Sequence, residues 1–346
     1  MYERTKQIDG TLPWRRVSPD GYVDYRVRYR AHGRVLYFNF PLAKEMGLVP
    51  SNHPGTLDKD LESIILETFS LVIINEYDLA QNKKYSPESV RPKPYMATRY
   101  LQTQHKNKQG KTSGDGRSIW NGWLRHKGFT FDISSRGTGA TILSPGAQAA
   151  DGVVKTGDES YGYSSGLAEL DEMLGSAVMS EIFYRQDIPT ERCLAVIGYP
   201  DATAIGVRSA PNLIRPAHIF RYLKQAKLCE LKASVDYFID REAENGIWKI
   251  DERSSRYSQA LAYFARSYGK LAAVLEEEYI FNWLAWDGDN ILASGAILDY
   301  GSIRQFAAKH DKYRFKDVDS YSASLIEQRR WARVLVQVFG PGLERA

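Results

Sequence analysis

The feature that most constrains the fold is a change of hydrophobic period near residue 210. Before it, segments such as 22–30 and 34–40 alternate polar and apolar residues, a period typical of half-buried strands. After it, 218–244 and 254–283 repeat their apolar residues with the period of an α-helix. Strands followed by helices predict an α+β protein with a strand-rich N-terminal part and a helical C-terminal part.

Strand signals are the clearest in the first part. The runs 22–30 and 34–40 are separated by a short turn sequence, which predicts that they pair as a hairpin. A second hairpin is predicted from 117–124 and 129–136 around another glycine-containing turn. Two further strands are expected within 192–209.

Helices are predicted over 61–79 and 322–339 from a periodic apolar face, and over 167–186, where the helix is expected to stop before Pro189. The Gly-, Ser- and Asp-rich stretch 144–166 is expected to be an exposed loop, and 114–116 a flexible one. The last helix is predicted to place these side chains on one side: Leu325, Trp331, Val334, Leu335 and Val338.

Composition narrows the function classes. A net charge of +4 over 346 residues gives little support to nucleic-acid binding. No apolar run approaches the length of a membrane span, and the first residues carry no signal-peptide core. We therefore expect a soluble, cytoplasmic protein that binds neither nucleic acid nor membrane.

Two familiar sites are excluded by spacing. Gly110-Lys-Thr112 suggests a phosphate-binding P-loop, but the first glycine of that motif would have to be residue 105, which is His. The six histidines form no paired-ligand motif, so a structural zinc or a zinc hydrolase is set aside.

A polar stretch near the C-terminus predicts a metal site. Asp289 and Asn290 are followed nine residues after Asn290 by a second carboxylate, Asp299. Asn290 and Asp299 offer the hard oxygen ligands that Mg²⁺ accepts from a few side chains together with nucleotide phosphates. Kinase-type sites hold their metals with an Asn and with the Asp of an Asp-x-Gly turn. The alternative is a polar turn between two buried strands, and this stretch alone leaves both open.

Two upstream features suggest a phosphate grip. The glycines of 114–116 precede the second hairpin, and Arg136 lies on its returning strand, as in kinases that cover ATP phosphates with a glycine loop and a cation. Arg208 and Arg215 flank a proline-containing turn, and a guanidinium binds phosphate oxygens bidentately. An ordinary surface hairpin and solvated arginines are the alternatives.

Four motifs in order resemble the selenoprotein O (SelO/YdiU) family, a pseudokinase-like group of protein AMPylators, as a divergent member. They are Gly114-Asp-Gly-Arg117, Ser135-Arg-Gly-Thr-Gly-Ala-Thr141, Ile188–Leu194 followed by Val207–Arg215, and Asp289-Asn290 with Asp299-Tyr-Gly301. The resemblance implies a protein-kinase-like two-lobed fold, with an N-lobe over 1–216, a helical C-lobe over 217–346 and a nucleotide cleft between them.

The resemblance also implies roles and partners. Asp289 would be the catalytic base, while Asn290 and Asp299 would hold Mg²⁺, or Mn²⁺ in its place. The residues implied to bind ATP are Gly114, Asp115, Gly116, Arg117, Arg136, Gly137, Gly139, Glu172, Arg208 and Arg215. The implied reaction transfers AMP from ATP to Ser, Thr or Tyr hydroxyls of protein substrates.

Departures from the family pattern keep other functions open. Arg136 stands where the family has a lysine, and the two are not equivalent at a phosphate grip. The family's helix glutamate corresponds to Glu172 by motif but to Ser176 by ungapped counting, with Glu181 a weaker candidate. A kinase acting on a protein or a small molecule, and a nucleotide-binding pseudoenzyme without turnover, are the alternatives to AMP transfer.

Overall fold

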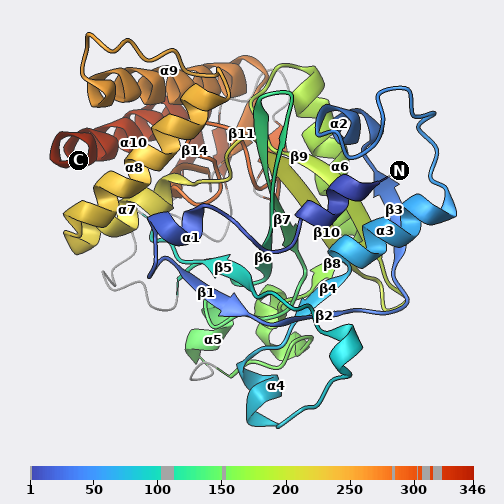
Figure 1. Ribbon diagram of the computed structural model, residues 1–346. Coiled ribbons are helices and arrows are strands. Elements are labelled where there is room, and N and C mark those ends of the chain that lie inside the picture. The colour runs from blue at the N-terminus through green and yellow to red at the C-terminus, as the bar shows by residue number, and fades with distance from the viewer. Residues whose placement is uncertain are drawn as a thin grey trace. The chain divides into compact units, whose positions relative to one another are not determined.

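The computed structural model describes residues 2–102, 113–149, 153–282, 285–301, 303–305, 312–314 and 322–346. It is an α+β protein, with one large antiparallel sheet and a group of longer helices that follow it in the chain (Figure 1). Within these residues, no helix is both long and apolar enough to cross a membrane. The rejected P-loop sequence at 110–112 lies outside the described residues.

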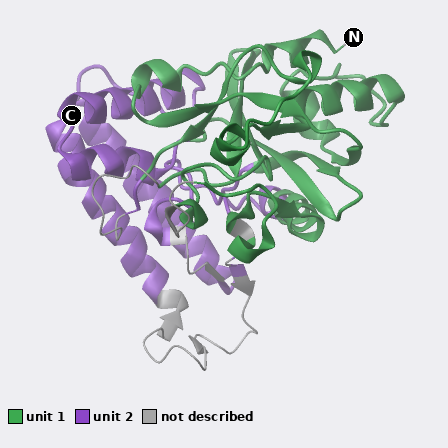
Figure 2. Ribbon diagram, turned by 90° about the horizontal axis from the view of Figure 1, so that it is seen from below, with its two compact units in different colours: residues 1–100, 109–181, 192–213 green, residues 101–108, 182–191, 214–346 purple. Residues whose placement is uncertain are grey.

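The chain divides into two compact units, coloured separately in Figure 2. Unit 1 comprises 1–100, 109–181 and 192–213, and unit 2 comprises 101–108, 182–191 and 214–346. Two short segments that precede residue 214 in the chain, 101–108 and 182–191, are therefore grouped with the C-terminal helices.

Unit 1 is built on an eight-stranded antiparallel sheet. Along the sheet, the strands are β1 (Tyr22–Tyr25), β5 (Tyr95–Thr98), β6 (Ser118–His126), β7 (Phe129–Arg136), β10 (Thr203–Ala210), β9 (Arg192–Gly198) and β3 (Arg34–Phe38), with β8 (Ala168–Glu169) also paired to β10. A separate two-stranded sheet joins β2 (Val27–Tyr29) to β4 (Leu71–Ile73).

Helices cover the two faces of this sheet in unit 1. On one face, Leu61 and Ile65 of α3 (Lys59–Phe69) and Leu42 of α2 (Phe40–Glu45) pack on alternate residues of the central strands, such as Ile205 and Val207. The opposite face is covered by the first part of α6 (Leu170–Arg185), which packs Met173 and Ala177 on Ala204 and Val196. Both faces of the central strands are therefore buried.

The remaining elements of unit 1 are short. They are η1 (Glu3–Gln7), α1 (Trp14–Val17), α4 (Glu76–Ala80), η2 (Pro87–Ser89), α5 (Pro145–Ala149) and η3 (Glu159–Ser165).

Unit 2 is mainly helical. Its elements are α7 (Pro216–Gln225), α8 (Leu228–Glu244), α9 (Arg256–Glu277), α10 (Leu325–Arg345), η4 (Ala285–Asp287) and the short strand pairs β11–β12 (Ile280–Asn282, Ile303–Gln305) and β13–β14 (Lys312–Arg314, Ser322–Ser324). Stacked rings join three of its helices, with Phe264 of α9 lying 4.1 Å from Phe339 of α10 and 5.5 Å from Phe238 of α8 between ring centroids.

Some predicted elements are confirmed. The second hairpin forms as β6 and β7 around Lys127 and Gly128, both at positive φ. The predicted helices beginning near residues 167, 254 and 322 form as α6, α9 and α10. The helix predicted over 218–244 is instead two helices, because Ala226 takes a left-handed conformation between α7 and α8.

Other expectations were wrong. The first hairpin does not form, because β1 pairs with β5, β2 with β4 and β3 with β9. The helix predicted over 61–79 ends at Phe69, because Leu71–Ile73 is a buried β-strand paired with β2. On α10, Leu335 is buried as predicted but Trp331 is 48% exposed.

The two predicted loops also differ from expectation. Within 144–166, the structure contains the short helices α5 and η3 and the buried side chains of Ala147 and Val154. The segment 114–116 is held in place, since Asp115 N–H donates to the carbonyl of Thr98 (2.9 Å) and Gly114 forms a bridge with Arg99.

Candidate functional site

In unit 2, a small antiparallel hairpin brings the predicted catalytic and metal residues together. Ile291 and Ile297 form an antiparallel bridge. Next to this bridge, the N–H of Leu298 donates to the carbonyl of Asn290 (3.1 Å), and the charge of Asp299 acts on the nearby Asp289. The polar residues therefore gather at the open end of the hairpin, while its closed end is apolar.

Asp289 has an uneven environment. Its Oδ2 atom accepts a hydrogen bond from Nε2 of Gln102 (2.7 Å), whereas its Oδ1 atom is buried and has no partner among the described residues. Burial raises the pKa of Asp289, and the charge of Asp299 raises it further, while the nearby Arg215 and the Gln102 hydrogen bond lower it.

The start of α7 positions both Arg215 and the hairpin. Arg215 is the N-cap residue, and its N–H donates to Nδ1 of His218 (2.9 Å). Two residues later, the N–H of Ala217 donates to the carbonyl of Gly288 (2.8 Å). One helix end thus fixes the backbone just before Asp289 and the arginine beside it.

Asp299 begins a tight turn that is anchored on its other side. Its Oδ1 atom accepts a hydrogen bond from the N–H of Gly301 (2.9 Å). The hydroxyl of Tyr300 lies 2.6 Å from that of Thr190 and donates to the carbonyl of Glu191 at 3.3 Å. The segment 182–191 therefore helps to fix the Asp-Tyr-Gly turn within unit 2.

In unit 1, Glu172 joins two of the predicted arginines. Arg117 binds its carboxylate with both terminal nitrogens, at 2.9 and 2.5 Å, and Nη1 of Arg136 lies 4.0 Å from Oε1. The strand register explains this grouping, because Ser118, the residue after Arg117, pairs with Arg136.

Arg208 lies on the same face of the sheet as Arg136. It pairs with Ser134, two residues before Arg136 on β7, and residues two apart on a strand point to the same side. Its Nε donates to the hydroxyl of Ser134 (2.9 Å). Both arginines are buried, at 6% and 7% exposure, so this face carries two enclosed guanidinium groups, of which that of Arg136 lies near the Glu172 carboxylate.

The structure selects among the glutamate candidates by contact. Ser176 lies one turn after Glu172 and donates its hydroxyl to the Glu172 carbonyl (2.9 Å). Glu181 instead accepts hydrogen bonds from Arg192 (2.8 and 3.0 Å) and Asn39 (2.7 Å). Of the three candidates, Glu172 is the one whose carboxylate contacts Arg117 and Arg136.

The predicted glycines are closely packed within unit 1. A Cβ on Gly137 would overlap the carbonyl oxygen of Ala204, and one on Gly139 would lie 2.7 Å from the side chain of Ile73. Gly114 and Gly116 are similarly enclosed by Thr98 and by Ser144. Close backbone packing therefore requires glycine here whether or not phosphate binds.

Asp115 is also held internally. It is buried, and its Oδ2 atom accepts hydrogen bonds from the N–H and hydroxyl of Thr98 (2.9 and 2.5 Å) and from the indole of Trp120 (3.0 Å). A carboxylate with three donors at one oxygen anchors the turn that precedes Arg117.

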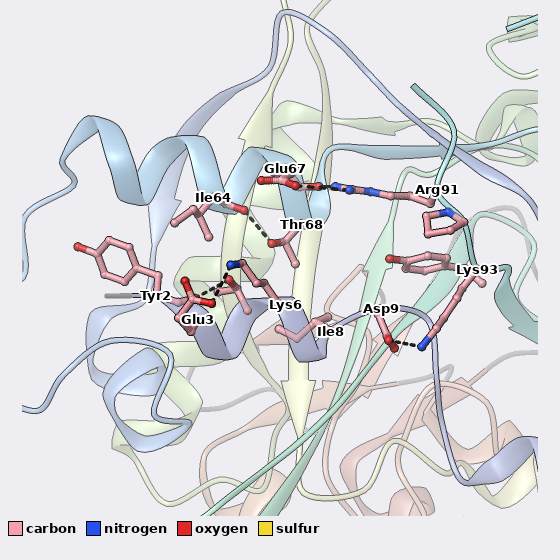
Figure 3. Close-up of a pocket in the computed structure, with 13 residues that line it drawn as sticks. Tyr2, Glu3, Lys6, Ile8, Asp9, Ile64, Glu67, Thr68, Arg91 and Lys93 are labelled. Carbon is pink, nitrogen blue, oxygen red and sulfur yellow. Dashed lines mark hydrogen bonds and ion pairs between the residues drawn. The ribbon is translucent and has the colours of Figure 1, made fainter. Parts of the chain in front are cut away.

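A pocket of about 280 Å³ lies elsewhere in unit 1, between η1, α3 and the segment before β5 (Figure 3). Its rim carries the ion pairs Lys6–Glu3, Lys93–Asp9 and Arg91–Glu67. None of the residues predicted to bind ATP or metal lines it.

Sequence reasoning missed Gln102. It follows β5 without a motif, and its partner Asp289 is 187 positions away. No local pattern reports such a contact.

The donor set fits magnesium better than zinc. Asn290 and Asp299 supply an amide and a carboxylate oxygen, and Mg²⁺ is commonly held by one or two carboxylates together with waters and substrate phosphates. Across the described ranges, no group of three His, Cys, Asp or Glu side chains is placed to hold a metal ion. The two-residue set is therefore adequate only for a cation that shares its coordination with a bound nucleotide.

No family model matches the chain. It is, however, 30% identical over 197 residues to the protein nucleotidyltransferase YdiU of Bacillus cereus. The resemblance to the SelO/YdiU family is confirmed. Proteins of the same name from Bacillus thuringiensis and Bacillus anthracis are each 29% identical over 199 residues. In all three cases, the match covers 54% of this chain and 36% of the YdiU protein, so it spans about a third of the relatives' length.

Proposed function

We propose that the chain is a Mg-ATP-dependent protein adenylyltransferase on a two-lobed, protein-kinase-like fold, acting in the cytoplasm. The relatives' name, protein nucleotidyltransferase, supports the reaction class. The observation that carries the proposal is the hairpin that gathers Asp289, Asn290 and Asp299, with Arg215 beside Asp289. The proposed lobes are 1–216 and 217–346.

In the proposed reaction, a Ser, Thr or Tyr hydroxyl oxygen of a protein substrate attacks the α-phosphorus of ATP. The bond from that phosphorus to the bridging oxygen of the β-phosphate breaks, and pyrophosphate leaves. The hydroxyl proton goes to Oδ1 of Asp289, the carboxylate oxygen that has no donor among the described residues. The products are the protein with AMP attached to its hydroxyl oxygen, pyrophosphate, and protonated Asp289.

Charge and position supply the rest of the catalysis. Arg136, Arg208 and Arg215 bind phosphate oxygens, and guanidinium groups hold their charge at all relevant pH values. Asn290 and Asp299 would hold Mg²⁺, which neutralises phosphate charge when it is bound. Glu172 orients Arg117 and Arg136 through the contacts described above.

Labelled ATP tests the proposal. The chain is incubated with Mg²⁺ and ATP labelled at the α- or the γ-phosphate, with itself and a mixture of hydroxyl-bearing peptides as acceptors. Protein-attached label from the α position supports AMP transfer. Label from the γ position alone means a kinase, and neither label together with calorimetric binding of Mg-ATP means a pseudoenzyme.

A matched pair of variants assigns the activity to the proposed residues. Asp289→Asn should reduce transfer to a small residual rate, because the amide cannot accept the proton. Asp240→Asn makes the same change at an exposed position on α8 and should transfer AMP at the parent rate. Equal activity of Asp289→Asn and the parent would remove Asp289 from the reaction.

A further inference from the structure

Gln102 is fixed by α7 on both sides of its backbone. The N–H of the preceding Leu101 donates to the carbonyl of Ala217 (3.0 Å). Lys224, two turns further along the same helix, donates its ammonium group to the carbonyl of Gln102 (2.6 Å). This residue is therefore held against one helix although it follows a strand of the other unit in sequence.

The same helix end also fixes the backbone next to Asp289, whose carboxylate accepts the hydrogen bond from Gln102. Ala217, whose carbonyl binds Leu101, donates its own N–H to the carbonyl of Gly288 (2.8 Å). Gly288 has φ +95°, and a Cβ there would lie 3.1 Å from the ring of Phe220. The backbones of Gln102 and Asp289 are thus both set by the first turn of α7, so their 2.7 Å side-chain contact is prepared by the fold.

The hydrogen bond from Gln102 makes the two oxygens of the Asp289 carboxylate different, although they are chemically equivalent. A carboxylate can turn about its terminal bond, since such sp³–sp² torsions are broad. The amide of Gln102 occupies Oδ2 and leaves Oδ1 buried without a partner among the described residues. A buried polar atom without a partner is costly, and such an atom in a native structure calls for an explanation.

We propose that Gln102 is a positioning residue, which holds the Asp289 carboxylate so that Oδ1 faces the attacking hydroxyl. The inference rests on the proposed function. An amide suits this role because it orients the carboxylate without bringing a positive charge to it. The charge near Asp289 comes instead from Arg215.

Gln102→Met tests the role, because methionine has a similar length but no donor. AMP-transfer kcat should fall by up to about 100-fold, the loss that a misplacement of about 1 Å can cause. The KM for ATP and the calorimetric affinity for Mg-ATP should stay at the parent values, since Gln102 contacts neither Asn290 nor Asp299 in the described structure. Gln186→Met makes the same change at an exposed position in unit 2 and should leave kcat unchanged.

A second variant and a double variant separate positioning from folding. Gln102→Asn keeps an amide but is one methylene shorter, so it should show the same loss of kcat. Adding Gln102→Met to Asp289→Asn should cause no further loss, because the residue acts through Asp289. Thermal unfolding of each variant reports whether the fold is retained.

The outcomes are distinct. If the parent transfers AMP and folded Gln102→Met matches its kcat, the positioning role is overturned alone. The same holds if Gln102→Met weakens Mg-ATP binding, or lowers residual activity further in the Asp289→Asn background. If the parent transfers no label from the α-phosphate, the proposed function fails and the positioning role falls with it.

Discussion

At the open end of the hairpin, burial raises the pKa of Asp289, and the like charge of Asp299 raises that pKa further. Such an arrangement is costly unless cations lie close by. Arg215 supplies one beside Asp289. A divalent cation held by Asn290 and Asp299 would supply further positive charge and so offset the repulsion between the two carboxylates.

Asp299→Ala should therefore abolish the metal-dependent part of ATP binding. The variant removes the carboxylate of the proposed metal pair, and Mg²⁺ should no longer strengthen ATP binding. Calorimetric titration with ATP in the presence and absence of Mg²⁺ measures this. Asp299→Asn keeps an acceptor for the N–H of Gly301 and should show the same loss, so collapse of the turn can be set aside. Mg-ATP affinity equal to the parent's would refute the metal assignment.

Arg136→Lys should preserve or raise AMP transfer. Glu172 is held mainly by the two-pronged contact of Arg117, while Arg136 stands 4.0 Å away, so a lysine at 136 need not orient the glutamate. Lysine would also restore the family's residue at this position. Initial rates of transfer from α-labelled ATP provide the measurement, with the exposed Arg125→Lys of the same hairpin as control. A folded but inactive Arg136→Lys would mean that the guanidinium itself is required.

At the scale of elements, Gly166 fixes how η3 meets the loop after β7. It has φ +86°, its carbonyl accepts a hydrogen bond from the N–H of Gly139 (3.0 Å), and a Cβ would overlap the backbone nitrogen of Ala140. Gly166→Ala should destabilise the protein by roughly 2–4 kcal/mol, combining left-handed strain with overpacking.

Gly175→Ala is the matched control for that substitution. Gly175 lies within α6, is exposed, and has no neighbouring atom within 4 Å of the place that an added methyl group would take. Alanine there should stabilise the protein by about 1 kcal/mol through helix propensity. Urea unfolding of both variants gives the comparison, and equal effects would show that local packing at Gly166 is looser than its contacts indicate.

The elements that sequence predicted well are those with local signals. The β6–β7 hairpin carries its own glycine turn, and the end of α6 is marked by Pro189, which follows it closely. Strands form within the first two predicted runs, but the run 22–30 divides into β1 and β2, which lie in different sheets. The predicted pairing was wrong because β3 pairs with β9, about 160 positions away, for which adjacent residues give no signal. The helix over 61–79 failed because burial and pairing with β2 favour a strand at Leu71–Ile73.

The candidate site was predictable only in part, for the same reason. Motif order indicated Asp289, Asn290 and Asp299, and all three lie next to the hairpin that the Ile291–Ile297 bridge closes. Glu172 could not be separated from Ser176 by counting, and only the contact with Arg117 distinguishes them. Gln102 gave no signal at all.

At the scale of the whole molecule, the proposed roles are divided between the two compact units. The arginines that contact Glu172 belong to unit 1, whereas Asp289 and the proposed metal ligands belong to unit 2. A stability measurement is therefore most informative when its signal can be assigned to one unit. Buried tyrosines offer such a probe for unit 1, because Tyr95 and Tyr199 both lie in it.

Stability should fall as pH rises from about 10 to about 12. Burial raises the pKa of Tyr95 and of Tyr199 to about 12 each, in the case of Tyr199 against the opposing effects of the Ser70 hydrogen bond and the Arg30 charge. An unfolded tyrosine ionises near pH 10, so within this window the unfolded chain binds fewer protons and becomes favoured. Below pH 10 both states keep the phenol protonated, and the stabilisation is fully present.

Tyr199→Phe should flatten this alkaline loss by up to about 1.4 kcal/mol per pH unit, the contribution of one proton. The variant also loses the contact between the Tyr199 and Ser70 hydroxyls (2.7 Å), which should lower stability at neutral pH by about 1 kcal/mol. The two effects separate in urea unfolding at pH 7, 9, 10, 11 and 12, because the second is constant below pH 9. A variant whose stability parallels the parent's through pH 12 would mean that Tyr199 ionises without cost in the folded unit.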